Sequence, residues 1–277
     1  MKVRENLSTI LIYAVTLLIL IFLILFVNPE NLVNSMIQLG FWGILILGVL
    51  YIIDLIIRAF RWKFLLIAQG IHLSVKSLIL PVASALAINL FTIARAGEFA
   101  RLYALKRNNN TKYSDTLSSI VIEQILSIFG LLIVITGGLF FLSSSLQQIE
   151  NSELIQQLIT LLFIGSVSIL IILSLIMIFP EFVEKIIRFF PLFIEIRLLS
   201  AYRAFLAGLS DLRSKPSLLF LGILSSTFIW LIEGLMLHVI AIFIIPEFGI
   251  IDLPWTITAS CAGNITFIIP ILPGAMG

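Results

Sequence analysis

Three charged side chains recur at every third position where an apolar run ends, in the stretch FTIARAGEFARLYALKR. Arg95, Glu98 and Arg101 would share one side of a short helix that Ala96 and Gly97 open. Guanidinium groups suit a phosphate, and a helix N-terminus adds positive potential. In this interpretation Glu98 orients one arginine and leaves the other free for a phosphate. The alternative is a cytoplasmic ion pair worth about 0.2–0.5 kcal/mol.

A second cluster of charge stands near the end of an earlier apolar run. Asp54 and Arg58 are spaced i, i+4 with the acid first, the favourable order on a helix, and Arg61 follows one turn later. The cluster could receive a phosphate. Alternatively, the arginines extend to the cytoplasmic surface beside Trp62. We favour this surface position for Arg61, Trp62 and Lys63, and leave both readings open for Asp54.

A single acid, Glu123, lies nine residues into the helix expected after Ser114, about 13 Å along its axis and near mid-membrane. Ser119 and Ser127 lie one turn to either side of it. Intramembrane acids are rare and mark substrate sites or proton pathways. Glu123 could bind an ammonium group, carry a proton or pair with Arg95. Its alternative is a protonated side chain packed against the serines.

Glu233 invites the same two interpretations, since Ser226 and Trp230 stand on adjacent turns. His238 lies off that face and is expected to pack between helices. The two histidines are far apart in the sequence, and Cys261 is the single cysteine, so we expect no disulfide, no metal site and no cofactor.

These side chains must be positioned by membrane helices. The chain has 277 residues, of which 60% are hydrophobic and 12% charged, and its mean hydropathy is +1.18. Soluble domains are roughly 45–50% apolar and about 25% charged. Only helices and closed barrels span a bilayer, and apolar runs this long predict helices. We take the first run as an uncleaved span. The runs are 7–27, 39–60, 77–94, 114–142, 154–179, 217–245 and 255–272.

The basic residues predict the topology. Both flanks of the third run are basic, so residues 77–105 are expected to form a re-entrant hairpin that breaks near Pro81 or within 89–97. The N-terminus and the stretches 58–76, 95–113 and 180–216 then lie in the cytoplasm and hold all 17 Lys and Arg. The alternative is a complete third span. The fold class is therefore an all-α polytopic membrane protein with about five full transmembrane helices and two re-entrant hairpins.

The last run resembles the third, which suggests an inverted repeat within a single membrane domain, 1–277. Asn89 and Asn264 hold corresponding places in the two units, and each unit ends in a glycine-containing break. The second tip, PILPGAMG, includes Pro273 and Gly274, which cannot continue a regular helix. We expect the chain to be a truncated form of a longer one. The units are 39–142 and 217–277, separated by a span, 154–179, and a cytoplasmic amphipathic connector, 180–216.

Four segments together resemble a known family: DLIIRAFRW, RAGEFARLYAL, SDTLSSIVIEQILSI and PILPGAMG. They are similar to the lysylphosphatidylglycerol synthase transmembrane region family, over nearly the whole chain. The resemblance implies a flippase-like domain in a bacterial or archaeal cell membrane, in a stand-alone form without an aminoacyl-transferase domain. Ala275 replaces a glycine that is usual in the family, and a following acid is absent from the sequence.

The expected function is therefore translocation of a phospholipid between leaflets, through a polar cavity lined by the two hairpins. A secondary transporter of a small solute or ion is the alternative, since it would use the same repeat. A membrane enzyme ranks third, because no nucleophile motif or acidic metal-binding motif is present. We expect a membrane phospholipid as partner, no nucleic acid, and leave a homo-oligomer open. The expected cavity residues are Asp54, Arg58, Asn89, Arg95, Gly97, Glu98, Arg101, Glu123, Glu233, Asn264, Pro273 and Gly274.

Overall fold

A computed structural model gives the arrangement of most of the chain. It describes residues 29–91, 97–109, 113–146, 153–189, 199, 202–203, 206, 210, 214–245, 247 and 249–264. The predicted first span, 7–27, lies outside these residues, as do Arg95, Pro273 and Gly274.

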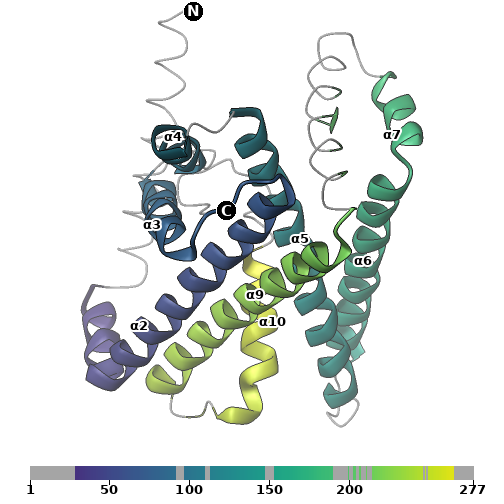
Figure 1. Cartoon of the computed structure of the whole chain (residues 1–277). Coiled ribbons are helices and arrows are strands. Elements are labelled where there is room, and N and C mark those ends of the chain that lie inside the picture. Colours follow the sequence, from purple (N-terminus) through teal and green to yellow (C-terminus); the bar gives the residue numbers. More distant parts are fainter. Residues whose placement is uncertain are drawn as a thin grey trace, which may run out of the picture.

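All the regular structure of the described residues is helical, as predicted. Within the described ranges, three helices are long and apolar enough to cross a membrane, over Val33–Ala68, Ser118–Leu142 and Pro216–Ile244. The helices are α2 (Pro29–Ala68), α3 (Val75–Phe91), α4 (Gly97–Asn109), α5 (Tyr113–Leu146), α6 (Glu153–Ile178), α7 (Pro180–Ile187), α9 (Pro216–Ile244) and α10 (Leu253–Gly263), with a short 3₁₀ helix, Ile250–Asp252, before the last (Figure 1).

α2 is longer than predicted at both ends. Residues 29–38 were expected to be a loop but are helical, and the interruption comes at Gly40, whose φ of 58° lies in the left-handed region that glycine adopts at little cost. The other end was expected to leave the membrane at about residue 60, and it continues as helix to Ala68. Arg58, Arg61 and Lys63 therefore lie on a helix and not in a loop, while the cytoplasmic side assigned to the stretch 58–76 stays a prediction.

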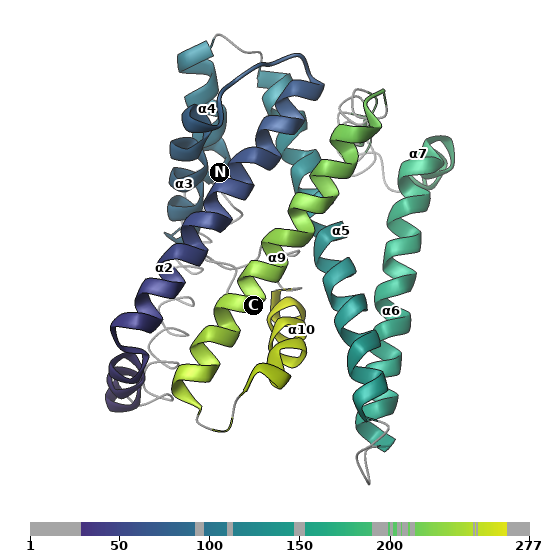
Figure 2. The same ribbon diagram turned by 60° about the horizontal axis from the view of Figure 1, so that its bottom comes forward.

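The long helices α2, α5 and α9 pack against one another at the centre of the molecule. α2 and α9 run side by side along much of their length, and α5 packs against both (Figures 1 and 2). α6 covers the far side of α5, and α10 lies between α9 and α5 (Figure 2). Buried apolar side chains join α5, α9 and α10 around Trp230, while a second cluster joins α2, α3 and α4 around Trp62. These two clusters hold the central helices at fixed distances.

α3 and α4 pack against each other as a helical hairpin, in agreement with the predicted turn in this region. α3 ends at Phe91 and α4 begins at Gly97, which agrees with the second of the two predicted break positions, 89–97. The first alternative, a break near Pro81, is wrong, because α3 continues through that proline. The Gly97 N–H donates to Asn89 Oδ1 at 2.8 Å, and a Cβ on Gly97 would collide with the Ala85 carbonyl oxygen. The close approach of the two helices therefore requires glycine at position 97. Re-entry into the membrane stays a prediction.

Candidate functional site

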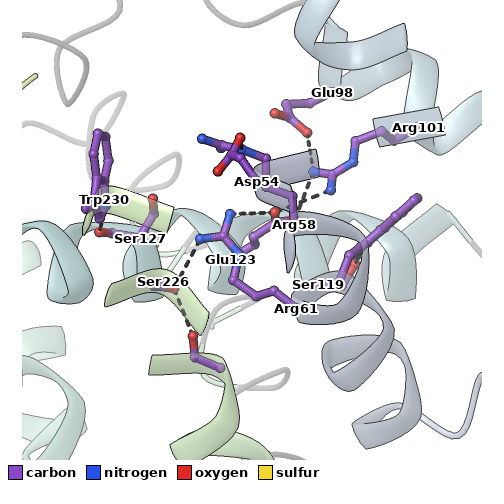
Figure 3. Close-up of polar contacts among 12 residues, drawn as sticks. Asp54, Arg58, Arg61, Glu98, Arg101, Ser119, Glu123, Ser127, Ser226 and Trp230 are labelled. Carbon is purple, nitrogen blue, oxygen red and sulfur yellow. Dashed lines mark hydrogen bonds and ion pairs between the residues drawn. The ribbon is translucent and has the colours of Figure 1, made fainter. Parts of the chain in front are cut away.

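A buried carboxylate, Glu123 of α5, lies at the centre of the largest group of ion pairs. Its oxygens accept hydrogen bonds from Arg61 Nη2 at 2.7 Å and from Arg101 Nη1 at 2.8 Å. The three side chains are only 3–4% exposed. Figure 3 shows the two guanidinium groups converging on Glu123 from opposite sides. The prediction that Glu123 might pair with Arg95 lies outside the described residues, and the two arginines found here come from α2 and α4.

Arg101 has two further contacts. Its Nη1 donates to Glu98 Oε2 at 2.9 Å, which confirms the pairing expected from their i, i+3 spacing (Figure 3). Its guanidinium also lies 4.3 Å from the centre of the Trp62 ring, within cation–π range. The Trp62 indole N–H donates to Ser119 Oγ at 3.2 Å. Arg101 is thus held and buried, so it is not the arginine that was predicted to stay free for a phosphate. The other arginine of this segment, Arg95, lies outside the described residues.

Arg61 extends the group to α9. Its Nη1 donates to Ser226 Oγ at 3.1 Å (Figure 3). Arg61 is 3% exposed and Trp62 is completely buried, so the predicted surface position of these two residues is wrong. The reason is the continuation of α2 beyond the predicted span, which brings Arg61 against α5 and α9 and Trp62 against α3, α4 and α5. Gly130 allows this packing, because a Cβ there would lie 2.6 Å from the Ser226 carbonyl carbon.

A second group of ion pairs joins α2 directly to α9. Arg58 Nε donates to Asp54 Oδ2 at 2.6 Å, as the i, i+4 spacing predicted, and Arg58 Nη2 donates to Glu233 Oε1. The second pairing could not be found by spacing, because its members are 175 residues apart. Asp54 is 3% exposed at its side chain, whereas Arg58 is 16% and Glu233 24% exposed. This group is therefore the more accessible of the two.

Together the two groups form one charged network inside apolar helices. Four buried or half-buried carboxylates meet three guanidinium groups in the described residues. Removing such charges from water costs several kcal/mol per ion, and replacing a buried ion pair with apolar side chains is often neutral or stabilising. Packing alone therefore does not account for the network. Its members are Asp54, Arg58, Arg61, Glu98, Arg101, Glu123 and Glu233.

Three buried polar atoms of this network have no hydrogen-bond partner within the part of the chain that the structure describes. They are Asp54 Oδ1, Arg61 Nε and Arg101 Nε. Buried polar atoms are satisfied in the great majority of native structures, so each of these needs an explanation. Two are cationic donors and one is an anionic acceptor, which leaves hydrogen-bonding capacity for both an anion and a proton donor.

An apolar cavity of about 320 Å³ lies farther along α5, between α5, α6 and α10. It begins at Leu132, nine residues after Glu123, which is about 13 Å along the helix. The lining residues are Leu132, Ile135, Leu139, Leu142, Leu161, Leu162, Gly165, Ser166, Ile169, Trp255, Thr258, Ala259 and Ala262. Apolar space of this kind accepts hydrocarbon.

Several predicted site residues have structural contacts instead. Asn89 accepts the Gly97 N–H in the hairpin, and the backbone N–H of Asn264 caps the end of α10. His238 Nδ1 and Thr256 Oγ1 are 2.9 Å apart, so the histidine joins α9 to α10, as expected of a packing residue. Among the described residues, no group of three or more His, Cys, Asp or Glu side chains is placed to hold a metal ion.

The fold and the site define a multi-pass helical membrane protein with charged side chains buried between its apolar helices. The model of the family described as lysylphosphatidylglycerol synthase TM region matches residues 10–277, and the chain belongs to this family. No curated protein and no solved structure matches the chain. The family match confirms the resemblance stated from the sequence.

Proposed function

We propose that the protein moves a phospholipid between the two leaflets of its membrane, and that the charged network receives the lipid headgroup. The observation that carries this proposal is the set of arginines buried between apolar helices, with Nε donors of Arg61 and Arg101 left unpartnered in the described residues. Guanidinium groups bind phosphate oxygens with charge-assisted hydrogen bonds. Charged side chains at membrane depth are costly and are typically functional.

Arg58 is the first arginine that a headgroup would meet. Its side chain is 16% exposed, whereas those of Arg61 and Arg101 are 4% exposed. A phosphate that binds Arg58 competes with the two carboxylates already there. This competition keeps binding weak enough for release, which transport requires as much as capture.

The apolar cavity favours a lipid over a small polar solute. A phospholipid needs a polar site for its headgroup and hydrocarbon surroundings for its acyl chains. α5 contributes to both, with Glu123 in the charged network and Leu132, Leu139 and Leu142 at the cavity. In this proposal the acids orient the arginines and perform no bond-breaking step, so the protein acts as a transporter and not as an enzyme.

The test is a flipping assay in reconstituted vesicles. A phosphatidylglycerol with a fluorescent headgroup is placed in both leaflets, and a membrane-impermeant quencher reports how fast the inner pool becomes accessible. We expect faster exchange with the protein than in empty vesicles. Arg58→Gln should slow the exchange by about tenfold, since it removes charge-assisted hydrogen bonds worth about 1.5–3 kcal/mol.

Arg203→Gln is the matched control. Arg203 is 56% exposed and pairs with Glu184, away from the network. It changes the same side chain in the same way, and exchange should stay at the rate of the unsubstituted protein. Equal rates for protein-containing and empty vesicles would overturn the proposal, and uptake of small solutes by the same vesicles would favour a solute transporter.

A further inference from the structure

Two carboxylates from different helices share one arginine in the more accessible part of the network. Arg58 donates through Nε to Asp54 of α2 and through Nη2 to Glu233 of α9. Glu123, by contrast, is held by two guanidinium groups. The Asp54 and Glu233 pair is therefore short of positive charge, and the Glu123 site is not.

The buried oxygen of Asp54 gives an independent observation. Asp54 is 2% exposed, and its Oδ1 has no hydrogen-bond partner among the described residues. A buried carboxylate oxygen normally accepts a hydrogen bond. The neighbourhood thus lacks one donor hydrogen as well as one positive charge, and a single proton supplies both.

We infer that Asp54 and Glu233 form a proton-binding site whose occupancy is coupled to the binding of an anionic phosphate at Arg58. This inference rests on the proposed function, because it takes the phosphate of a lipid headgroup as the ligand of that arginine. When the phosphate oxygens accept the N–H groups of Arg58, the two carboxylates lose their shared counterion.

Two carboxylates without a counterion in a low-dielectric site do not both remain ionised. One takes a proton from the aqueous phase. The phosphate adds one negative charge to the site and the proton adds one positive charge, so the net charge of the network is unchanged. Glu233 takes up the proton, since its side chain is 24% exposed and that of Asp54 is 3% exposed. In this inference the protonated Glu233 then donates its hydrogen to Asp54 Oδ1, the buried oxygen that lacks a partner among the described residues.

The other groups around Glu233 do not replace that proton. α2 presents Arg58, Asp54 and, farther off, Arg61. Arg61 is already bound to Glu123 of α5 and to Ser226. α10 presents the buried thiol of Cys261, which carries no positive charge.

The remaining ionisable groups of the packed elements have contacts of their own. His238, also on α9, is bound through Nδ1 to Thr256. Arg101 and Glu98 of α4 belong to the Glu123 side of the network. Among the residues that the structure describes, Arg58 is thus the cation that pairs with Asp54 and Glu233. When phosphate binds Arg58, a proton replaces it as the positive charge of that pair.

Calorimetric titration in two buffers tests the inference directly. Protein in detergent is titrated with dihexanoyl phosphatidylglycerol, once in a buffer with a large ionisation enthalpy and once in a buffer with a small one, at the same pH. A proton taken up on binding makes the measured heat depend on the buffer. We expect uptake of up to one proton per bound lipid.

In Glu233→Gln the heat of lipid binding should no longer depend on the buffer. Glu184→Gln, which changes an acid outside the network, should keep the buffer dependence. A parallel titration with inorganic phosphate separates the two sources of the anion. If phosphate alone reproduces the proton uptake, the site recognises the anion; if only the lipid does, recognition includes the rest of the molecule.

Binding of the lipid with equal heats in both buffers would overturn the proton site while leaving the headgroup site intact. Persistence of buffer dependence in Glu233→Gln would also overturn it, because another group would then carry the proton. Absence of lipid binding by the unsubstituted protein would overturn both this inference and the proposed function. Lipid flipping without proton uptake would refute the coupling between proton binding and phosphate binding, and would leave the proposed lipid transport in place.

Discussion

The two halves of α5 differ sharply although they belong to one continuous helix. The first half carries Ser119 and Glu123, which take part in hydrogen bonds and ion pairs with α2 and α4. The second half carries Leu131, Leu139 and Leu142, which pack against α9 and α10 or line the apolar cavity. Both halves bury part of their side chains, and they differ in what is buried.

The comparison shows that the two halves of α5 contribute to stability in different ways. The apolar half gains free energy from every buried side chain, at about 25 cal/mol per Å². The charged half must first offset the desolvation of its ions, and it is stable only while each ion keeps its partner. Removing one partner in the charged half should therefore cost more than most changes in the apolar half.

The largest effect is expected from Glu123→Ala. The substitution leaves Arg61 and Arg101 without their shared anion in a buried site, and breaking a buried pair in this way costs about 3–5 kcal/mol. We expect a strongly reduced midpoint of thermal unfolding in detergent. Glu184→Ala is the control, because it removes an acid from an exposed pair. Equal stability of the two variants would contradict the larger cost expected for unpairing ions in the charged half of α5.

A smaller effect is expected where α5 touches α9. In Gly130→Ala the new Cβ would lie 2.6 Å from the Ser226 carbonyl carbon and 2.7 Å from the Thr227 nitrogen, and backbone atoms cannot easily move aside. Overpacking of this kind costs about 1–3 kcal/mol. Denaturation of the purified protein measures the change in the free energy of unfolding.

Gly137→Ala is the matched control for this contact. Gly137 lies on the same helix, and its Cβ would have nothing within 4 Å. Alanine is favoured over glycine in a helix interior by up to about 1 kcal/mol, so the control should be neutral or stabilising. The two variants make the same chemical change and are expected to have opposite signs. A destabilised Gly137→Ala would contradict the packing described here.

A third prediction concerns the polar contact between His238 of α9 and Thr256 of α10. Thr256→Val removes the hydroxyl beside His238 Nδ1 and leaves a buried ring nitrogen unsatisfied, at a cost of about 1–3 kcal/mol. Thr227→Val is the comparison, since Thr227 bonds the carbonyl of its own helix at Ile223. Unfolding in detergent should show a larger loss in the free energy of unfolding for Thr256→Val than for Thr227→Val. The reverse order would show that His238 does not depend on Thr256.

The sequence predicted those parts of this arrangement that depend on local spacing. The helices 114–142 and 217–245, the pairing of Asp54 with Arg58, and that of Glu98 with Arg101 all follow from hydrophobic length or from i, i+3 and i, i+4 geometry. The family was also recognised from short segments. Each of these signals lies within a few turns of one helix.

The contacts between helices were not predictable in this way. Glu233 with Arg58 and Ser226 with Arg61 depend on how α9 crosses α2, which no spacing within either helix specifies. Arg61 was assigned to the surface because arginine near a span end usually extends to water. The sequence signal that could have indicated the contact between α5 and α9 is the glycine at position 130. Gly130 of α5 lies against Ser226 of α9, and its lack of a side chain allows the close approach.

The smallest effect is expected at the exposed pair of Arg203 and Glu184, which lies outside the predicted spans. The hydrogen bond from Arg203 and its positive charge hold the pKa of Glu184 below its usual range. Because the folded-state pKa is depressed, the pair stabilises the protein above the ordinary carboxyl pKa, and this contribution is lost as the pH falls through the depressed value. Arg203→Ala should raise the Glu184 pKa toward the ordinary value, as measured by NMR titration of a labelled carboxyl. The thermal midpoint at neutral pH should change less than in the variants expected above to be destabilised, since solvent screens exposed charges. A shift as large as that of Glu123→Ala would mean that exposure does not distinguish the two kinds of ion pair in this protein.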